Sequence, residues 1–269
     1  MRRRRRSLPG FIVIGAQRSG TTSLFHYLCR HPQIAGSPVK EVHFFDHQFW
    51  RGVDWYRSYF PTVAAQARAR NGGGGELVGG EATPYYLFHP AVPARLAATV
   101  PDVRLVAILR NPVDRAYSHY WRSIDCRVER LSFVEALAAE TGRLEGEEKK
   151  LMARPRYRSF NHRHRAYAAR GLYAEQLERW FAHFPREQVL VIRAEDFFAR
   201  PNEVYADILE FLGVAPFDPA GFTARNPKDY EPLSDDLREL LEQRFAEPNE
   251  HLAELLGTDV WWPTPARVG

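Results

Sequence analysis

The sequence predicts one α/β domain with a central parallel sheet and helices on both faces. Three apolar runs, at 11–14, 103–109 and 188–192, indicate buried strands, and segments with helical spacing separate them. Strands that alternate with helices along a chain favour parallel pairing. A hydrophobic content of 45% over 269 residues is enough for one packed core, and no internal segment has the composition of a domain linker.

The first strand, 11–14, leads into a loop bounded by Gly15 and Gly20, and a helix follows the loop. Backbone N–H groups and a helix N-terminus together favour an anion, so this stretch predicts a phosphate-binding loop. The two glycines match half of a Walker A motif. However, Thr21 stands where a triphosphatase needs Lys, and Arg18 is the only cation inside the loop. The sequence therefore indicates a poor nucleotide triphosphatase, with an ordinary strand-to-helix turn as the alternative.

The remaining segments continue the α/β pattern. A strand-like piece follows the glycines at 72–75, and residues 81–86 are expected to form a loop. Pro112 favours a helix start after the second apolar strand. Further helices are expected over 132–150, 173–181, 203–212, 233–245 and 249–256.

Charge and cysteine content narrow the function classes. Arg2–Arg6 supply five of the positive charges behind the net charge of +4, so the rest of the chain carries about −1. Such a short basic tail does not predict nucleic-acid binding. Two cysteines, without metal-type spacing, favour a reducing compartment, and no apolar run reaches the length of a membrane helix. We therefore expect a cytoplasmic protein, and the excess of Arg over Lys hints at a bacterial source.

His43 and His47 are four residues apart and could share a helix face as metal ligands. No third ligand has a convincing spacing. The sequence therefore predicts no metal site.

Three segments, in this order, resemble the motifs of the PAPS-dependent sulfotransferases, where PAPS is 3′-phosphoadenosine 5′-phosphosulfate. Residues 17–24 (QRSGTTSL) are similar to the 5′-phosphosulfate loop, residues 40–46 (KEVHFFD) to the segment with the catalytic carboxylate, and residues 109–118 (LRNPVDRAYS) to the 3′-phosphate motif. The likeness is greatest to the branch with the heparan sulfate sulfotransferases and many bacterial relatives. It covers about 11–262, which implies a basic flexible tail at 1–10, a sulfotransferase domain at 11–262 and a C-terminal tail at 263–269.

The resemblance implies roles for particular residues. Glu41 takes the position of the catalytic carboxylate and is the expected general base, with His43 as the competing candidate and Arg18 neutralising the leaving phosphate. Arg110 and Ser118 lie eight residues apart across a strand, a turn and a helix, so both could reach one anion, here the 3′-phosphate. The complete set of expected donor-binding residues is Gln17, Arg18, Ser19, Gly20, Thr21, Thr22, Ser23, Arg110, Ser118, Arg225 and Lys228.

Two positions depart from the family pattern. Many members have Lys where this chain has Arg18, and Arg presents a planar fork where Lys presents a point charge. Heparan-type relatives tend to have Lys where this chain has Ala82. The loss of that cation near the reacting centre argues against a heparan-like acceptor.

The resulting hypothesis is in-line transfer of a sulfuryl group from PAPS to a hydroxyl or amine of a glycan or small metabolite, without a metal. A P-loop-type small-molecule kinase and a non-catalytic nucleotide-binding module are the alternatives. Residues 43–60 and 151–170 are expected to line the acceptor cleft. They contain no pattern from which the acceptor could be identified.

Overall fold

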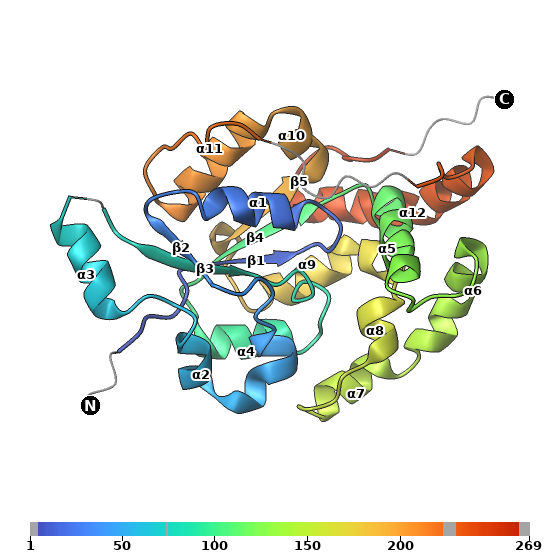
Figure 1. Cartoon of the computed structure of the whole chain (residues 1–269). Helices are drawn as coiled ribbons and strands as arrows, with labels where there is room; N and C mark the ends of the chain where they lie inside the picture. The colour runs from blue at the N-terminus through green and yellow to red at the C-terminus, as the bar shows by residue number, and fades with distance from the viewer. Residues whose placement is uncertain (1–4, 74, 223–229, 264–269) are drawn as a thin grey trace.

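The structure of the chain is a computed structural model that describes residues 5–73, 75–222 and 230–263. Its strands form a five-stranded sheet in the order β2-β3-β1-β4-β5, and each neighbouring pair is parallel. Helices cover both faces of this sheet (Figure 1), which confirms the predicted α/β class. The strands are β1 Phe11–Gly15, β2 Ile34–Gly36, β3 Val78–Ala82, β4 Arg104–Leu109 and β5 Val189–Arg193.

The three apolar runs form β1, β4 and β5, as predicted. Residues 81 and 82, expected in a loop, instead end β3, and the three-residue β2 was not predicted. The glycines in β3 conceal the strand pattern, and packing explains one of them. A Cβ at Gly80 would lie 2.1 Å from the ring of Phe11, so a side chain there would collide with β1.

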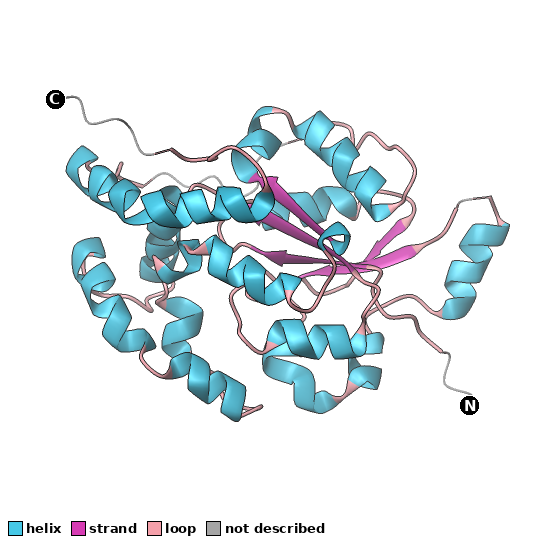
Figure 2. Cartoon of the chain, turned by 180° about the vertical axis from the view of Figure 1, so that it is seen from behind, coloured by secondary structure: helices cyan, strands magenta, loops and turns pink. Residues whose placement is uncertain are grey.

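Alternating side chains of β1 point to the two faces of the sheet and anchor two separate cores. Ile12 and Ile14 pack in a core that includes residues of α4 and α9, whereas Phe11 and Val13 pack in a core with residues of α1 and α11. All four side chains are fully buried. The sheet, drawn in magenta in Figure 2, therefore lies between two layers of helices.

The predicted helices form in the predicted order, with differences at their ends, whereas the helices at 53–57, 63–71, 92–99, 160–164 and 194–199 were not predicted. Asn111 caps the helix after β4 by accepting from the Val113 N–H at 2.9 Å, and Pro112 is the first residue of that helix, as predicted. The α-helices are α1 Thr21–Leu28, α2 Val53–Arg57, α3 Val63–Asn71, α4 Val92–Thr99, α5 Pro112–Asp125, α6 Phe133–Leu144, α7 Glu147–Ala153, α8 Phe160–His164, α9 Tyr173–Phe181, α10 Ala194–Ala199, α11 Pro201–Leu212 and α12 Asp235–Leu256. The shorter turns are η1 Phe44–Gln48, η2 Phe49–Arg51, η3 Ala169–Gly171 and η4 Arg186–Gln188.

Two helix boundaries differ from prediction. The segment 132–150 contains two helices, because Gly146 adopts a φ of 71° between α6 and α7. The two helices expected at 233–245 and 249–256 are one helix, α12, which continues through Pro248. Proline removes one backbone donor, and burial of Phe245 and Leu252 on either side keeps the two halves of α12 packed on the domain.

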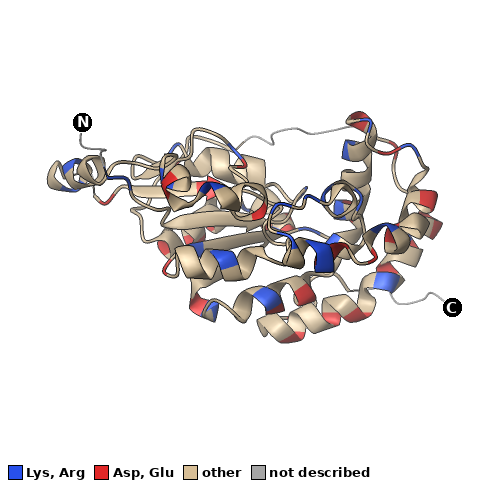
Figure 3. Cartoon of the chain, turned by 90° about the horizontal axis from the view of Figure 1, so that it is seen from below, with Lys and Arg blue, Asp and Glu red and all other residues tan. Residues whose placement is uncertain are grey.

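Residues 5–10, within the segment expected as a basic flexible tail, make backbone contacts with the domain. Arg6 pairs with Thr62 in an isolated antiparallel bridge, and the Ser7 N–H donates to the Pro61 carbonyl at 3.0 Å. Basic and acidic positions are interspersed on the helices, with little charge on the strands (Figure 3). This distribution agrees with the near-neutral charge of the chain outside its arginine run.

A buried carboxyl group, that of Glu81, connects β3 to helix α2 by a hydrogen bond. Glu81 is fully buried and accepts from the hydroxyls of Tyr56 at 2.5 Å and Thr83 at 2.7 Å. Burial raises the pKa of Glu81 to about 7 despite these hydrogen bonds. The folded protein therefore holds this proton more tightly than the unfolded chain does.

Replacing Glu81 by Gln should change how stability depends on pH. A raised carboxyl pKa adds stability below about 4.5, and this stability is lost as the pH rises through about 7. Between pH 5 and 8 the native protein should lose about 2 kcal/mol of unfolding free energy relative to Glu81→Gln. Urea denaturation of both proteins at the two pH values measures this difference. Parallel pH dependences would contradict the protonated state of Glu81.

Candidate active site

The loops that follow β1, β3 and β4 meet at one edge of the sheet, because these three strands are parallel neighbours. A cavity of about 790 Å³ lies there. Its walls include residues of the loop after β1 and of the first turns of α1, residues of α5, and residues from the segments 40–43 and 163–170. Segments far apart in the sequence thus contribute to one site.

The loop after β1 places a helix N-terminus at the cavity. Gly20 precedes α1 with a φ of 95°, a conformation that favours glycine, and α1 has no side-chain cap. A helix leaves the N–H groups of its first turn without intrahelical partners, so an anion can accept from them. Residues 21–23, which form this first turn, line the cavity. The predicted anion-binding loop therefore has the geometry that its sequence implied.

An arginine cluster, made of Arg18, Arg110 and Arg122, lies beside Ser118 of α5. The Arg18 Nε donates to the Ser118 Oγ at 3.0 Å, and the Arg110 Nη1 donates to the Arg18 carbonyl at 3.4 Å. Burial lowers the pKa of Arg18, and the charges of Arg122 and Arg110 lower it further. These like charges gain most from an anion between them, since no carboxylate bonds to Arg18 within the described ranges.

Glu41 lies at the head of a chain of charged hydrogen bonds. Its carboxylate accepts from the Lys40 Nζ at 2.8 Å, and its other oxygen lies 3.3 Å from the His43 Nε2. The His43 Nδ1 lies 2.5 Å from a carboxylate oxygen of the buried Asp46. Both Glu41 and His43 have positive φ values, 62° and 53°. The Glu41 N–H donates to the Ala82 carbonyl at 3.0 Å, which fixes this turn against the end of β3.

The chain of contacts sets the protonation of each group. Burial alone would raise the pKa of Glu41, but the His43 hydrogen bond and the Lys40 ammonium outweigh it and lower the pKa to about 2. Burial would lower the pKa of His43, yet hydrogen bonds to Asp46 and Glu41 raise it to about 9. At neutral pH the resting site therefore holds two carboxylates, Glu41 and Asp46, bridged by an imidazolium.

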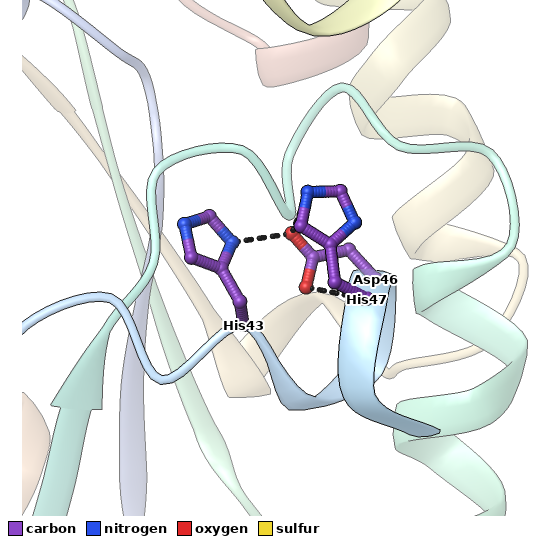
Figure 4. A group of neighbouring side chains, drawn as sticks. All are labelled: His43, Asp46 and His47. Atoms are coloured by element: carbon purple, nitrogen blue, oxygen red, sulfur yellow. Dashed lines mark hydrogen bonds and ion pairs between the residues drawn. The ribbon is translucent and has the colours of Figure 1, made fainter. Parts of the chain in front are cut away.

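His43, Asp46 and His47 come close enough to be tested as a metal site (Figure 4). One potential ligand atom from each lies within 4.8 Å of the others. However, both ring nitrogens of His43 already face protein groups. The Nδ1 faces Asp46, and the Nε2 lies 3.3 Å from Glu41 and 3.2 Å from an Arg163 nitrogen. The cationic Arg163 beside this group disfavours a second cation. The absence of a resident metal stays a prediction.

The cavity as a whole is basic. Among the described residues that line it, Glu41 is the single carboxylate, and the cations are Arg18, Lys40, Arg110, Arg122, Arg163 and Arg170. The Arg170 guanidinium is buried, lies 4.9 Å from the ring centre of Tyr85 and donates to the side chain of Gln17. This excess of positive charge favours an anionic ligand. The other wall is aromatic and includes Tyr27, Phe197, Phe198 and Phe222.

Most residues predicted for the site line this single cavity. They are Gln17, Arg18, Gly20, Thr21, Thr22, Ser23, Glu41, His43, Arg110 and Ser118. Ser19 is fully buried and is not part of the lining. Arg225 and Lys228 lie outside the described residues. The roles assigned to these residues stay predictions.

Several cavity residues were not predicted. Lys40 and the aromatic wall are the main ones, and Arg163 and Arg170 were predicted only as members of the segment 151–170. Lys40 could have been found from its place beside Glu41. Of the two segments expected to line an acceptor cleft, 151–170 contributes Arg163, His164 and Arg170, whereas 43–60 contributes only His43 to the described lining. The other aromatic residues of 43–60 pack mainly in the core, for example Phe44 and Tyr56, whose rings stack at 4.4 Å.

The fold and the site together define an α/β protein with an anion-binding strand–loop–helix at the carboxyl edge of its sheet. The sulfotransferase domain family matches residues 8–220, and the chain belongs to this family. This confirms the resemblance that the three sequence motifs indicated.

Known proteins with similar sequences support the assignment. The chain is 29% identical to the membrane-associated sulfotransferase kil1 of Dictyostelium discoideum over 95% of its own length and 66% of that protein. It is 31% identical to the human bifunctional heparan sulfate N-deacetylase/N-sulfotransferase 3, with coverage of 93% and 30%. A solved sulfotransferase from Alicyclobacillus acidocaldarius is 35% identical and has a TM-score of 0.69, with coverage of 94% of this chain and 97% of that one.

The chain thus spans less than two thirds of the length of these two relatives. Within the described residues, no helix combines the length and the apolar character that crossing a membrane requires.

The protonation of His43 can be measured directly. Its imidazole should titrate near pH 9 in the free protein, because Asp46 and Glu41 both favour the charged form over the cost of burial. Replacing Asp46 by Asn should bring the His43 pKa down. Nuclear magnetic resonance of the histidine side chains against pH follows both proteins, and His43→Gln identifies the signal. A native pKa near 6.5 would contradict the bridged arrangement.

Proposed function

We propose that this protein transfers a sulfuryl group from PAPS to a hydroxyl or amine of a glycan or small metabolite. The main support is that one cavity combines three features that this reaction needs. These are a helix N-terminus for the phosphosulfate, an arginine cluster for a second phosphate, and a carboxylate between Lys40 and His43. Membership of the sulfotransferase family supports the same reaction.

The shape of the cavity suggests how the donor binds. The 3′-phosphate would lie at Arg110 and Ser118, and Arg18, which bonds to Ser118, would neutralise the leaving 5′-phosphate from beside it; no carboxylate bonds to these groups among the described residues. The 5′-phosphosulfate would accept from the N–H groups of residues 21–23. The adenine would stack in the aromatic part of the wall, where the Phe198 side chain is half exposed.

The reaction needs a base and stabilisation of the leaving group. The acceptor oxygen or nitrogen attacks sulfur and its proton passes to Glu41, while the bond from sulfur to the 5′-phosphate oxygen breaks and its electron pair stays on the phosphate. Backbone N–H groups of α1 stabilise that oxygen without proton transfer. The His43 imidazolium, held by Asp46, keeps the Glu41 carboxylate oriented.

The metal requirement, cellular location, source and partners are part of the same proposal. A PAPS reaction at this site would need no metal, because the donor has no γ-phosphate and the arginines supply the positive charge. We retain cytoplasmic location and bacterial origin as predictions from cysteine content and composition. No nucleic-acid partner is expected.

A screen of acceptors with radiolabelled PAPS tests the function. The panel contains glycans with free hydroxyl and amino groups and small hydroxylated metabolites, assayed with and without EDTA. We expect label transfer that is insensitive to EDTA. No transfer to any acceptor, together with magnesium-dependent ATP binding, would contradict the proposal and favour a kinase.

Nucleotide selectivity tests the placement of the 3′-phosphate. Adenosine 3′,5′-bisphosphate (PAP) should bind at least about tenfold more tightly than AMP, because each charge-assisted contact contributes roughly 1.5–3 kcal/mol. Arg110→Ala should weaken PAP binding and leave AMP binding almost unchanged, whereas Arg154→Ala, at an exposed position, should change neither. Calorimetry measures all four affinities. Equal affinity of the native protein for the two nucleotides would contradict this assignment.

Removing the base should affect turnover far more than donor binding. Glu41→Gln keeps the shape of the side chain but cannot accept the proton, so turnover should fall by roughly two to four orders of magnitude. PAP affinity should barely change. His43→Ala should reduce turnover less, because Glu41 remains, and Glu187→Gln, at an exposed site, is the matched control. Near-normal turnover of Glu41→Gln on a verified acceptor would show that the base lies elsewhere.

A further inference from the structure

Lys40 has no assigned role, yet its ammonium lies at the reacting centre. The Lys40 Nζ lies 2.8 Å from the Glu41 Oε1, and both side chains are partly exposed to the same cavity as residues 17–23. The turn that carries them is held by the Glu41 N–H bond to the Ala82 carbonyl. The backbone beside Lys40 is therefore held in place, while the Lys40 side chain stays 31% exposed.

Arg18, the cation in the loop after β1, faces a different part of the cavity from Lys40. The Arg18 guanidinium contacts Ser118 of α5. The charges of Arg110 and Arg122 are close enough to lower the pKa of Arg18. In this arrangement Lys40 contacts one oxygen of Glu41, and the His43 imidazolium lies 3.3 Å from the other. An Arg163 nitrogen lies 3.2 Å from the same His43 Nε2 that faces Glu41.

The His43 imidazolium already balances part of the Glu41 charge, and a further cation favours binding of an anionic transferable group beside it. A sulfuryl group in place for attack by an acceptor bound at Glu41 carries negative charge on its oxygens. A carboxylate and a sulfuryl group close together repel each other, and this repulsion is strong where water is excluded. An ammonium between the two would cancel it, and the Lys40 Nζ already contacts the carboxylate.

We propose that Lys40 recognises the sulfuryl group of the donor: its ammonium shifts from Glu41 to the sulfuryl oxygens when PAPS binds. This inference rests on the proposed function and identifies the residue that distinguishes PAPS from PAP, which lacks the sulfuryl group. The shift also leaves Glu41 free to accept the acceptor proton. The flexible stem of Lys suits such a movement, because its three donors can rotate from one partner to another.

Binding of the two nucleotides to Lys40→Met tests the proposal without any acceptor. Calorimetry should show PAPS affinity reduced about ten- to hundredfold, the range for loss of one charge-assisted contact, while PAP affinity changes far less. Retained PAP binding also shows that the variant is folded. Lys40→Arg should retain more PAPS affinity than Lys40→Met, and Lys149→Met, outside this cavity, should retain all of it.

The same measurement in a Glu41→Gln background separates direct contact from screening. If Lys40 bonds to the sulfuryl oxygens, Lys40→Met should still weaken PAPS binding when residue 41 is neutral. Loss of the effect in that background would show that Lys40 only screens Glu41, and would overturn the proposal. Equal weakening of PAPS and PAP by Lys40→Met would overturn it as well.

Failure of the underlying function looks different. The native protein would then transfer no sulfuryl group to any acceptor, or would bind neither nucleotide, whatever residue stands at position 40.

Discussion

The parallel pairing of β1 with both β3 and β4 is the constraint on which the site depends. It brings the loop after β1, the end of β3 and the start of α5 to one edge of the sheet. Further hydrogen bonds join these ends, since the Thr83 N–H donates to the Val13 carbonyl at 3.1 Å and the Ala16 N–H to the Ile108 carbonyl at 2.7 Å. The cavity is therefore built on three strands whose residues are largely buried. A rigid base of this kind favours precise placement of the charged groups above it.

Left-handed backbone conformations concentrate at the residues with proposed roles. Arg18, Glu41 and His43 all have positive φ values although none is glycine. Each such conformation costs about 1–3 kcal/mol and persists where the surroundings enforce it. Here the enforcing contacts are visible, for example the Arg110 bond to the Arg18 carbonyl and the Asp46 bond to His43. These backbone conformations therefore lower the stability of the domain, and they direct the three side chains into the cavity.

Local sequence signals predicted the framework of the fold and much of the site. The apolar runs of β1, β4 and β5 are long enough to show as strands, but β2 has three residues and ends at Gly36. Residues close together in the sequence, such as Glu41 and His43, could be assigned to one site from their spacing. The contact between Arg18 and Ser118 spans 100 residues and depends on strand order, which local patterns do not contain. Arg163 and the aromatic wall reach the cavity only through tertiary packing.

The account depends most on one claim, that a single nucleotide bridges the α5 arginine cluster and the N-terminus of α1, with its reactive end at Glu41. A crystal structure with PAP bound tests this claim most directly. We predict the 3′-phosphate at Arg110 and Ser118 and the 5′-phosphate on the N–H groups of residues 21–23, directed toward Lys40 and Glu41. The reverse orientation, with the 5′-phosphate on Ser118, or PAP outside this cavity, would contradict the account.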